Sequence, residues 1–399
     1  MTDRVSTTQF VQQGLNQILT QQQQIADTQQ QLASGRRVLS PSDDPAGATR
    51  ILSLRESVAT LQQYNDNISL ADSRLRIEES ALISAGDLLQ RARELAIQAN
   101  NATQTNETRA GTAVELRGIL DGLLASANTR DANNEYIFAG FRTNAPPFVQ
   151  TSSGFNYIGD QGVRSVQIGS SRQVAVGDSG QQVFFDIANG NGTFATSAST
   201  SNTGNGIIDN GSVTDISSYV PDTYTVTFGA GGTYQVTDSS SNVVSSGIHT
   251  SGEAIGFLGI QAVLTGQPEA GDTFTFAPST GQDVFSTIQD LINVLETTVT
   301  DPSSQADLNN GINVALANID QALDNVVQTR SSVGSRLNAL EDQTNINSIF
   351  ELEAQTSLAG IEDIDIAAVI SDFNQRLVSL QAAQQAFVQV QRLSLLNFL

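Results

Sequence analysis

The stretch "SGRRVLSPSDDPAG", Ser34–Gly47, separates two long segments rich in Gln and Leu, and it is dense in charges and helix breakers. Gly35 directly follows "QQLAS" and fits the left-handed residue that closes a helix. Pro41 stops any continuation, because proline lacks the backbone N–H that a helix interior needs. Asp44-Pro45 has the pattern of an N-cap residue followed by proline at the first helical position. The stretch therefore predicts an ordered connector between two helices.

The charges of this connector match the helix ends that it joins. Arg36 and Arg37 follow the end of the first helix, where the helix dipole favours cations. The paired aspartates precede the second helix, where the dipole favours anions. A purely structural connector is one interpretation. The other is that it makes or orients contacts with a neighbour through a set of six residues: Arg36, Arg37, Pro41, Asp43, Asp44 and Pro45.

Both ends of the chain carry sparse apolar stripes with the four-three spacing of a coiled coil. The N-terminal stripe contains Val11, Leu15, Ile18, Ile25 and Leu32. The C-terminal stripe contains Ile366, Ile370, Phe373, Leu377, Leu380, Phe387 and Val390. A lone helix with so few apolar residues is marginal in water, and chain ends usually fray. We therefore expect the terminal helices to dock against each other and against other subunits through these residues.

Further helical patterns lie inside the chain. The heptad spacing runs from Leu54 to Ala96, and other amphipathic stretches cover Glu107–Asn128, Asp283–Thr298, Ser304–Asn345 and Ile366–Leu396. The longest of these patterns has the stripe of an ordinary helix core. These segments predict long helices that return from both ends of the chain and run side by side.

The middle of the chain has the pattern of strands. "TYTVTFGAGGTYQVT", Thr223–Thr237, alternates apolar and polar residues on both sides of a glycine-rich turn, which predicts a hairpin. The Gly/Ser/Thr/Asn stretch Asn189–Gly206 is typical of a loop or linker between two small β units.

The predicted fold is α+β and multidomain: long antiparallel, coiled-coil-like helices from both termini form a rod, into which an all-β middle region is inserted. The expected domains are a core helix with connector (1–44), the first half of the helical rod (45–142), the β insertion split near 190–206 (143–281), the second half of the rod (282–345) and a C-terminal core helix (346–399).

Composition excludes several classes of function. The chain has 19 basic and 41 acidic residues, a net charge of −22, and no Cys. All basic residues are Arg, and none lies between Gln173 and Thr329, so we expect neither nucleic-acid binding nor attachment to an anionic membrane. Residues 1–30 contain no apolar run longer than two, so no cleaved signal peptide is expected and ordinary export rules predict a cytoplasmic protein.

Residues suited to catalysis or metal binding are scarce. His249 is the only histidine, and we expect it to be an exposed or hydrogen-bonded loop residue rather than a zinc ligand. "DIANGNG" and "DNGSVTD" resemble calcium loops only in part, because neither has the full spacing or the terminal Glu. We predict no catalytic, metal-binding or cofactor-binding residues, no cofactor and no enzyme activity.

Several longer motifs resemble one family. "QQLASGRRVLSPSDDPAGATRI" and "LLQRARELAIQANNAT" are similar to the corresponding segments of bacterial flagellins and flagellar hook-associated proteins. "EYIFAGFRTNAPPF", "SVQIGSSRQVAVGDSGQQVF" and the ending "AAQQAFVQVQRLSLLNFL" resemble the hook-associated proteins of the hook–filament junction. The chain departs from the family in having no Lys.

The resemblance implies a structural junction role by helix-mediated polymerisation. In that family the terminal helices pair as a coiled coil and pack into a tubular core, while the β insertion projects outward. The implied partners are further copies in a ring, the first hook-associated protein on the hook side and flagellin on the filament side. Export by the flagellar type III apparatus, without a cleaved signal peptide, would place the protein outside the cell. The resemblance also implies a cytoplasmic chaperone on the C-terminal helix, around Phe373–Leu395.

Two alternatives remain open at this point. A filament subunit of the flagellin type would polymerise alone into long filaments, whereas a junction protein would form a short ring or need its neighbour. A secreted adhesin or calcium-binding surface protein, built around the acidic β middle, predicts a calcium-dependent thermal shift.

Overall fold

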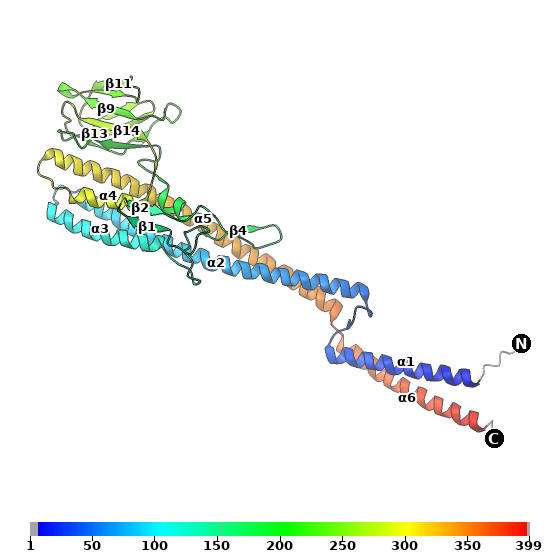
Figure 1. Ribbon diagram of the computed structural model, residues 1–399. Coiled ribbons are helices and arrows are strands. Elements are labelled where there is room, and N and C mark those ends of the chain that lie inside the picture. The colour runs from blue at the N-terminus through cyan, green and yellow to red at the C-terminus, as the bar shows by residue number, and fades with distance from the viewer. Residues whose placement is uncertain (1–6, 153, 397–399) are drawn as a thin grey trace. The chain divides into compact units, whose positions relative to one another are not determined.

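The computed structural model of the protein describes residues 7–152 and 154–396 (Figure 1). The chain forms two compact units. The terminal unit contains the residues up to Asp66 and from Gln343 onward, and the central unit contains Asn67–Asp342. Helices α2 (Pro45–Ala99) and α5 (Pro302–Glu362) contribute residues to both units.

The terminal unit is helical. Besides the first part of α2 and the last part of α5, it contains α1 (Thr7–Ser34) and α6 (Ile366–Leu396). The prediction that the helix before α6 ends at Asn345 was wrong, because α5 continues to Glu362. The added sequence, "INSIFELEAQTSLAGIE", has no proline and is rich in good helix formers, so nothing in it ends the helix.

The central unit has a helical core built by α2, α3 (Asn106–Ala127), α4 (Val284–Glu296) and α5. The predicted α2 stripe is confirmed, since Leu75, Leu82 and Leu89 are fully buried. Thr105 caps α3 through a capping box, and the Asp283 side chain accepts the Ser286 N–H at the start of α4. The core also contains a cluster of aromatic rings, four from the segments between α3 and β5 and one from α4: Phe138, Phe148, Phe155, Phe184 and Phe285.

Short strand pairs lie against this helical core. They are β1 (Phe148–Thr151) with β2 (Gly154–Tyr157), β3 (Ser165–Gln167) with β4 (Gln173–Ala175), and β5 (Ile187–Ala188) with β15 (Gly281–Gln282). A π-helical turn, η1 (Gln181–Phe185), precedes β5. Because β5 enters the inserted domain and β15 leaves it, their pairing returns the chain to the place from which it left.

The inserted β-domain has two sheets and its own hydrophobic core. The larger sheet has the order β11-β10-β9-β14-β6, with bounds β6 (Phe194–Ala198), β9 (Tyr224–Phe228), β10 (Thr233–Thr237), β11 (Val243–Ile248) and β14 (Thr273–Pro278). The smaller contains β7 (Ile207–Ile208), β8 (Ser212–Val213), β12 (Ala254–Phe257) and β13 (Ile260–Thr265). Every second side chain of β9 is buried in the shared core, as the alternating sequence predicts.

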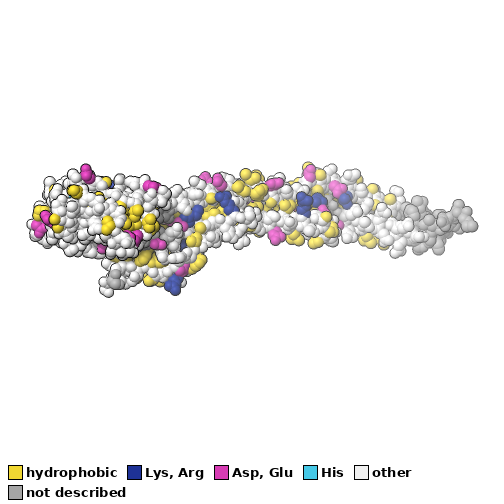
Figure 2. Space-filling view, turned by 90° about the horizontal axis from the view of Figure 1, so that it is seen from above, with side chains coloured by type: hydrophobic (Ala, Val, Ile, Leu, Met, Phe, Trp, Pro, Cys, Tyr) yellow, Lys and Arg dark blue, Asp and Glu magenta, His cyan; other side chains and the backbone are white. Residues whose placement is uncertain are grey.

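The predicted hairpin at Thr223–Thr237 is confirmed as β9 and β10, joined by the 3-10 turn Ala230–Gly232. The prediction that Asn189–Gly206 is a loop throughout was wrong, because Phe194–Ala198 forms the edge strand β6. Buried Phe194 and Thr196 hold that strand against the sheet, and the Thr196 hydroxyl donates to the Asp209 carbonyl. Figure 2 shows mainly uncharged surface with scattered acidic side chains on the visible face of this domain.

Candidate assembly surface on the terminal helices

Helices α1 and α6 pack side by side in antiparallel directions, so the start of α1 lies near the end of α6 (Figure 1). Near the start of α1 and the end of α6, a Cβ placed on Gly14 would lie 3.0 Å from the Phe387 ring. Glycine at this position therefore allows the ring to approach α1. In the middle, Arg376 Nη1 donates to Gln24 Oε1 over 2.9 Å. At the other end, the Ile364 N–H donates to the Gly35 carbonyl over 3.2 Å.

The predicted stripe residues are only partly covered by this pairing. Half-buried residues are Val11, Ile18, Ile25, Leu32, Phe373, Leu377, Leu380 and Phe387. Leu15, Ile366 and Ile370 are 44%, 60% and 45% exposed. Thr28 is the one buried side chain in the described part of the two helices, and the side chain of Val390 lies outside the described residues. The pair therefore has no apolar core of its own among the described side chains.

The sequence analysis missed several apolar residues on the outer faces of the terminal unit. On α1 and α6 they are Leu19, Val378 and Val388, and on α5 they are Ile346, Ile349, Phe350 and Leu352, all exposed. The α5 group lies within the expected C-terminal core helix (346–399), but an apolar stripe was predicted only from Ile366 onward. Its i, i+3, i+4 spacing was the available signal.

The connector between α1 and α2 has the predicted local structure. Gly35 has φ +72° and its N–H donates to the Gln31 carbonyl over 2.8 Å, which closes α1. Asp44 Oδ1 accepts the Gly47 N–H over 2.8 Å, which caps α2 at Pro45. Asp43 accepts the backbone N–H groups of Leu39 and Ser40, and these bonds, with that of the Ser40 hydroxyl, lower the pKa of Asp43.

The connector arginines act on α5 rather than on the end of α1. Arg36 Nε and Arg55 Nη2 both lie 2.6 Å from Glu362 Oε1, whose side chain is only 8% exposed. Arg37 Nε donates to the Ile361 carbonyl over 3.1 Å, at the negative end of the α5 dipole. The arginines thus join the α1–α2 connector to the α5–α6 turn. The sequence analysis missed Glu362, because only the fold brings it to the arginines.

A small cavity lies behind the connector. Its volume is about 170 Å³, and its apolar lining includes Val38, Leu39, Ile51 and Leu52. Pro41, one of the predicted connector residues, forms part of the same wall. The connector therefore leaves space beside α2, and the ion pairs of Glu362 join it to α5 together with the bond from the Arg37 N–H to the Glu362 carbonyl over 2.6 Å.

Comparisons with known proteins place the chain in one family. The family model of the bacterial flagellin N-terminal helical region matches residues 5–143, and that of the bacterial flagellin C-terminal helical region matches residues 316–399. Flagellar hook-associated protein 3 of Escherichia coli K12 is 25% identical over 395 residues, which are 98% of either chain. The crystal structure of flagellar hook-associated protein-3 from Legionella pneumophila is 34% identical, with a TM-score of 0.76 over 78% of this chain and 98% of that chain. FlgL from Xanthomonas campestris is 30% identical, with a TM-score of 0.73 over 77% of this chain and 99% of that chain.

The chain belongs to the family of flagellar hook-associated protein 3. It is therefore a structural component of the bacterial flagellum, with a flagellin-like fold at both ends. The flagellin models leave residues 144–315 unmatched, whereas the hook-associated relative from Escherichia coli aligns along nearly the whole chain.

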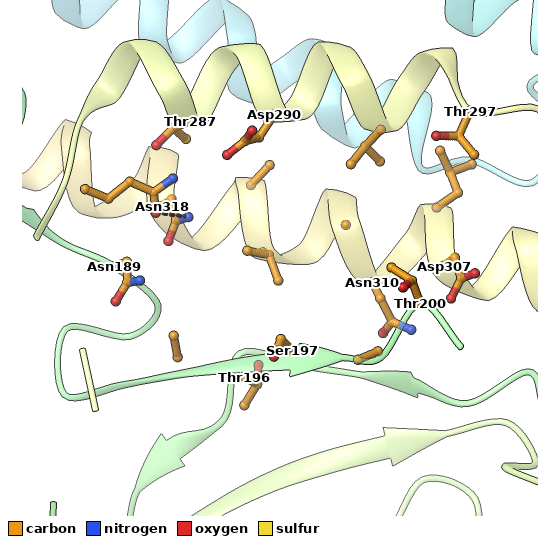
Figure 3. Close-up of a pocket in the computed structure, with 18 of the residues that line it drawn as sticks. Asn189, Thr196, Ser197, Thr200, Thr287, Asp290, Thr297, Asp307, Asn310 and Asn318 are labelled. Atoms are coloured by element: carbon orange, nitrogen blue, oxygen red, sulfur yellow. Dashed lines mark hydrogen bonds between the residues drawn. The ribbon is translucent and has the colours of Figure 1, made fainter. Parts of the chain in front are cut away.

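In this hook-associated protein a large cavity lies in the central unit, between the β-domain and helices α4 and α5 (Figure 3). Its volume is about 660 Å³, and no Arg lines it. Asp290 of α4 and Asp307 of α5 border it, and partial desolvation, followed by nearby acidic charges, raises the pKa of each. The side-chain amides of Asn310 and Asn318 at its wall each donate one hydrogen bond and accept one, to the β-domain and to Gln282 of β15.

The described residues contain neither a cluster suited to a metal ion nor a membrane-spanning helix. Over residues 7–152 and 154–396, no three His, Cys, Asp or Glu side chains come together to hold a metal ion. No helix in the described chain combines the length and apolarity that a membrane crossing requires. The expectation that His249 would be exposed or hydrogen-bonded was wrong: its half-buried ring stacks edge-on against Phe228, and neither ring nitrogen has a hydrogen-bond partner of good geometry among the described residues.

Proposed function

We propose that this chain joins the hook side of a bacterial flagellum to its flagellin filament, and that α1 and α6 are the surfaces through which copies assemble. The observation that carries the proposal is the pairing of two long helices without a buried apolar core among their described side chains. Complete burial of each Leu, Ile or Phe contributes about 1.5–3 kcal/mol. Packing against further copies supplies the burial that one chain lacks.

The proposed partners follow from the family. Copies of the chain form a ring, which contacts the first hook-associated protein on the hook side and flagellin on the filament side. The Legionella pneumophila relative is described as a flagellar junction protein, which supports this arrangement. The flagellin-like helices at both ends of the chain support it too, because a flagellin subunit of the filament can pack against helices that resemble its own.

Export and protection before assembly form the finer part of the proposal. The chain leaves the cell through the flagellar type III apparatus without a cleaved signal peptide. A cytoplasmic chaperone covers the C-terminal helix around Phe373–Leu395 until export. The exposed apolar side chains of Val378 and Val388 support a protective partner, because such surfaces promote aggregation when left open.

A truncation that ends at Asp365 and removes residues 366–399 tests the proposal in motile cells. We expect hooks without filaments by electron microscopy, with flagellin monomers lost to the medium. Normal filaments on the truncated protein would overturn the proposal. Immunoblots of the medium separate a defect of assembly from a defect of export.

A matched pair of point variants gives a sharper test. Val378→Asn changes α6 where the side chain is 66% exposed, and Val114→Asn changes α3 of the central unit where it is 64% exposed. We expect filament attachment to fall in Val378→Asn and to stay normal in Val114→Asn. Equal effects in both variants would mean that the terminal surface has no special role.

The second candidate is a filament subunit, which the flagellin family models at both ends favour. The purified chain separates the two functions. Long filaments formed by this chain alone would favour the filament subunit. Short rings, or assembly only with hook-side or filament-side neighbours, would favour the junction protein.

A further inference from the structure

Glu78 of α2 is a nearly completely buried carboxyl group in the central unit. It is 1% exposed, and its Oε1 accepts the backbone N–H of Asp178 over 3.0 Å. Its Oε2 is also buried and has no hydrogen-bond partner among the described residues. Asp178 belongs to the segment between β4 and η1, which lies between α2 and α5 on its way to the β-domain.

The charges around Glu78 do not balance. Asp178 forms an ion pair with Arg336 of α5, and both side chains are mostly buried. The other nearby arginine, Arg330 of α5, is already paired with Glu79 over 2.8 Å. Two carboxyl groups, on Glu78 and Asp178, therefore share the single guanidinium of Arg336.

Burial and charge repulsion determine which of the two carboxyl groups, Glu78 or Asp178, carries a proton. A buried carboxylate beside another carboxylate is unfavourable, because it loses hydration and gains repulsion. Burial first, and the charge of Asp178 second, raise the pKa of Glu78 to about 8, while Arg336 and the Asp178 N–H act in the opposite direction. The proton therefore belongs on Glu78, which is 1% exposed and has no guanidinium partner of its own among the described residues, while the Asp178 carboxyl group is the one paired with Arg336.

We propose that Glu78, Asp178 and Arg336 form a proton-operated latch that fastens the segment before η1 to α2 and α5. With the proton on Glu78, its carboxyl group lies against Asp178 without repulsion. Loss of that proton to solvent places two negative charges beside one guanidinium, and the Asp178 segment separates from α2. All of its residues lie in the central unit, whereas the proposed assembly helices α1 and α6 lie in the terminal unit.

The latch controls the path of the chain into the β-domain. Beyond Asp178, the Gly180 N–H donates to the Phe138 carbonyl over 2.8 Å. Asn325 of α5 then holds the carbonyls of Gln182 and Val183, and β5 follows. Opening at Asp178 separates the segment from α2 at that residue. The bonds that Gly180 and Asn325 make farther along the segment remain.

The direction of the pH dependence follows from the pKa of Glu78. The closed latch binds a proton up to about pH 8, whereas a solvated Glu releases it near its ordinary value of 4.5. The closed form therefore loses stability as pH rises between these two values, about tenfold in the opening equilibrium for each pH unit. Below and above this window Glu78 contributes no slope.

Hydrogen exchange of the full-length chain, corrected for the intrinsic exchange rate at each pH, tests the latch. For the amides of Asp178 and the η1 residues, we expect the opening equilibrium to rise with pH in the unmodified chain and to be flat in Glu78→Gln. Glu79→Gln is the matched control, since it breaks the neighbouring Arg330 pair and should keep the slope. The same slope in Glu78→Gln, or no slope in the unmodified chain, would overturn the proposal.

A direct titration of the unmodified chain does not depend on how well a variant folds. Carboxyl carbon chemical shifts of the unmodified chain should give Glu78 a midpoint near 8. In Asp178→Asn the midpoint should move down, because the repelling charge is gone. A Glu78 midpoint near the ordinary value in the unmodified chain would exclude the latch.

Discussion

Glu362 of α5 pairs with an arginine of the connector and with an arginine of α2 in the terminal unit. Both Arg36 and Arg55 pair with the same buried oxygen, Oε1, whereas the guanidinium groups themselves are about half exposed. Exposed ion pairs contribute little, but a buried acceptor of two charge-assisted bonds contributes more. The side chain thus links α2 and the connector to the last turn of α5.

Replacement of this side chain by its neutral isostere tests that role. We expect Glu362→Gln to lower the unfolding free energy of the terminal unit by about 1–2 kcal/mol, because both charge-assisted bonds weaken. The same substitution at Glu353, an exposed residue of α5, should change it by less than about 0.5 kcal/mol. Urea unfolding, with proteolysis of the connector as a local readout, measures the difference. Equal midpoints for the two variants would contradict the assignment.

His249 gives the β-domain a pH dependence at the scale of a single residue. Burial lowers the pKa of His249, while the Gly266 backbone and the charge of Glu253 oppose the shift. A histidine with a lowered pKa binds its proton more readily in the unfolded chain. Stability is therefore fully present above the unfolded value of about 6.5 and falls as pH drops below it.

The window between pH 6.5 and pH 5 isolates this residue from the aspartates of the domain. Those with a lowered pKa, including Asp215 and Asp238, remove stability only near and below their ordinary value of 3.8. We expect the midpoint of thermal unfolding of the β-domain to drop between pH 6.5 and pH 5 in the unmodified chain, and to drop less in His249→Phe. An identical drop in both chains would show that the imidazole does not cause it.

At the scale of elements, asparagines of α5 hold the β-domain. Asn310 donates to the Gly206 carbonyl over 3.0 Å and accepts the Ile208 N–H over 2.9 Å. Asn318 accepts the Gly190 N–H over 2.9 Å and donates to Gln282 over 2.8 Å. These bonds lie beside the large cavity of Figure 3, so they replace the apolar packing that an interdomain contact usually provides.

Removal of one such amide should loosen the β-domain without disturbing its core. Asn310→Leu leaves a buried N–H and a buried carbonyl unpaired, each at about 1–3 kcal/mol. Asn309→Leu, at the next and less buried position, is the control. Hydrogen exchange of β7 should accelerate strongly in the first variant and little in the second. Slow exchange in Asn310→Leu would mean that the domain is held in another way.

Some helices and strands could be predicted from the sequence, and others could not. The connector, the helices and the hairpin of β9 and β10 were predictable because caps, heptads and alternation are local signals. The last part of α5 was assigned to the C-terminal core helix and not to the helix before it, because its apolar residues lie on an exposed face, without a buried stripe that continues from the rod. Strand β6, Glu362 and Glu78 depend on partners distant in the chain, which no local pattern contains.

At the scale of the whole molecule, charge and assembly act against each other. The chain has a net charge of −22, so copies repel one another at low ionic strength. The proposed assembly helices have few charges: α1 contains Asp27 alone, and α6 contains Asp372, Arg376 and Arg392. Contacts along these helices are therefore mainly apolar, while the repulsion comes from the rest of the chain.

Salt should consequently strengthen self-association of the purified chain. An increase of ionic strength from about 0.01 M to about 0.15 M shortens the Debye length from about 30 Å to about 8 Å, which screens the repulsion and leaves the apolar contacts intact. Sedimentation velocity should show more oligomer at the higher salt concentration. The truncation that ends at Asp365 should show no such gain, because it lacks one of the two assembly helices. Oligomers that dissociate as salt is added would instead mean that ion pairs between copies, and not the apolar stripes of α1 and α6, hold the assembly together.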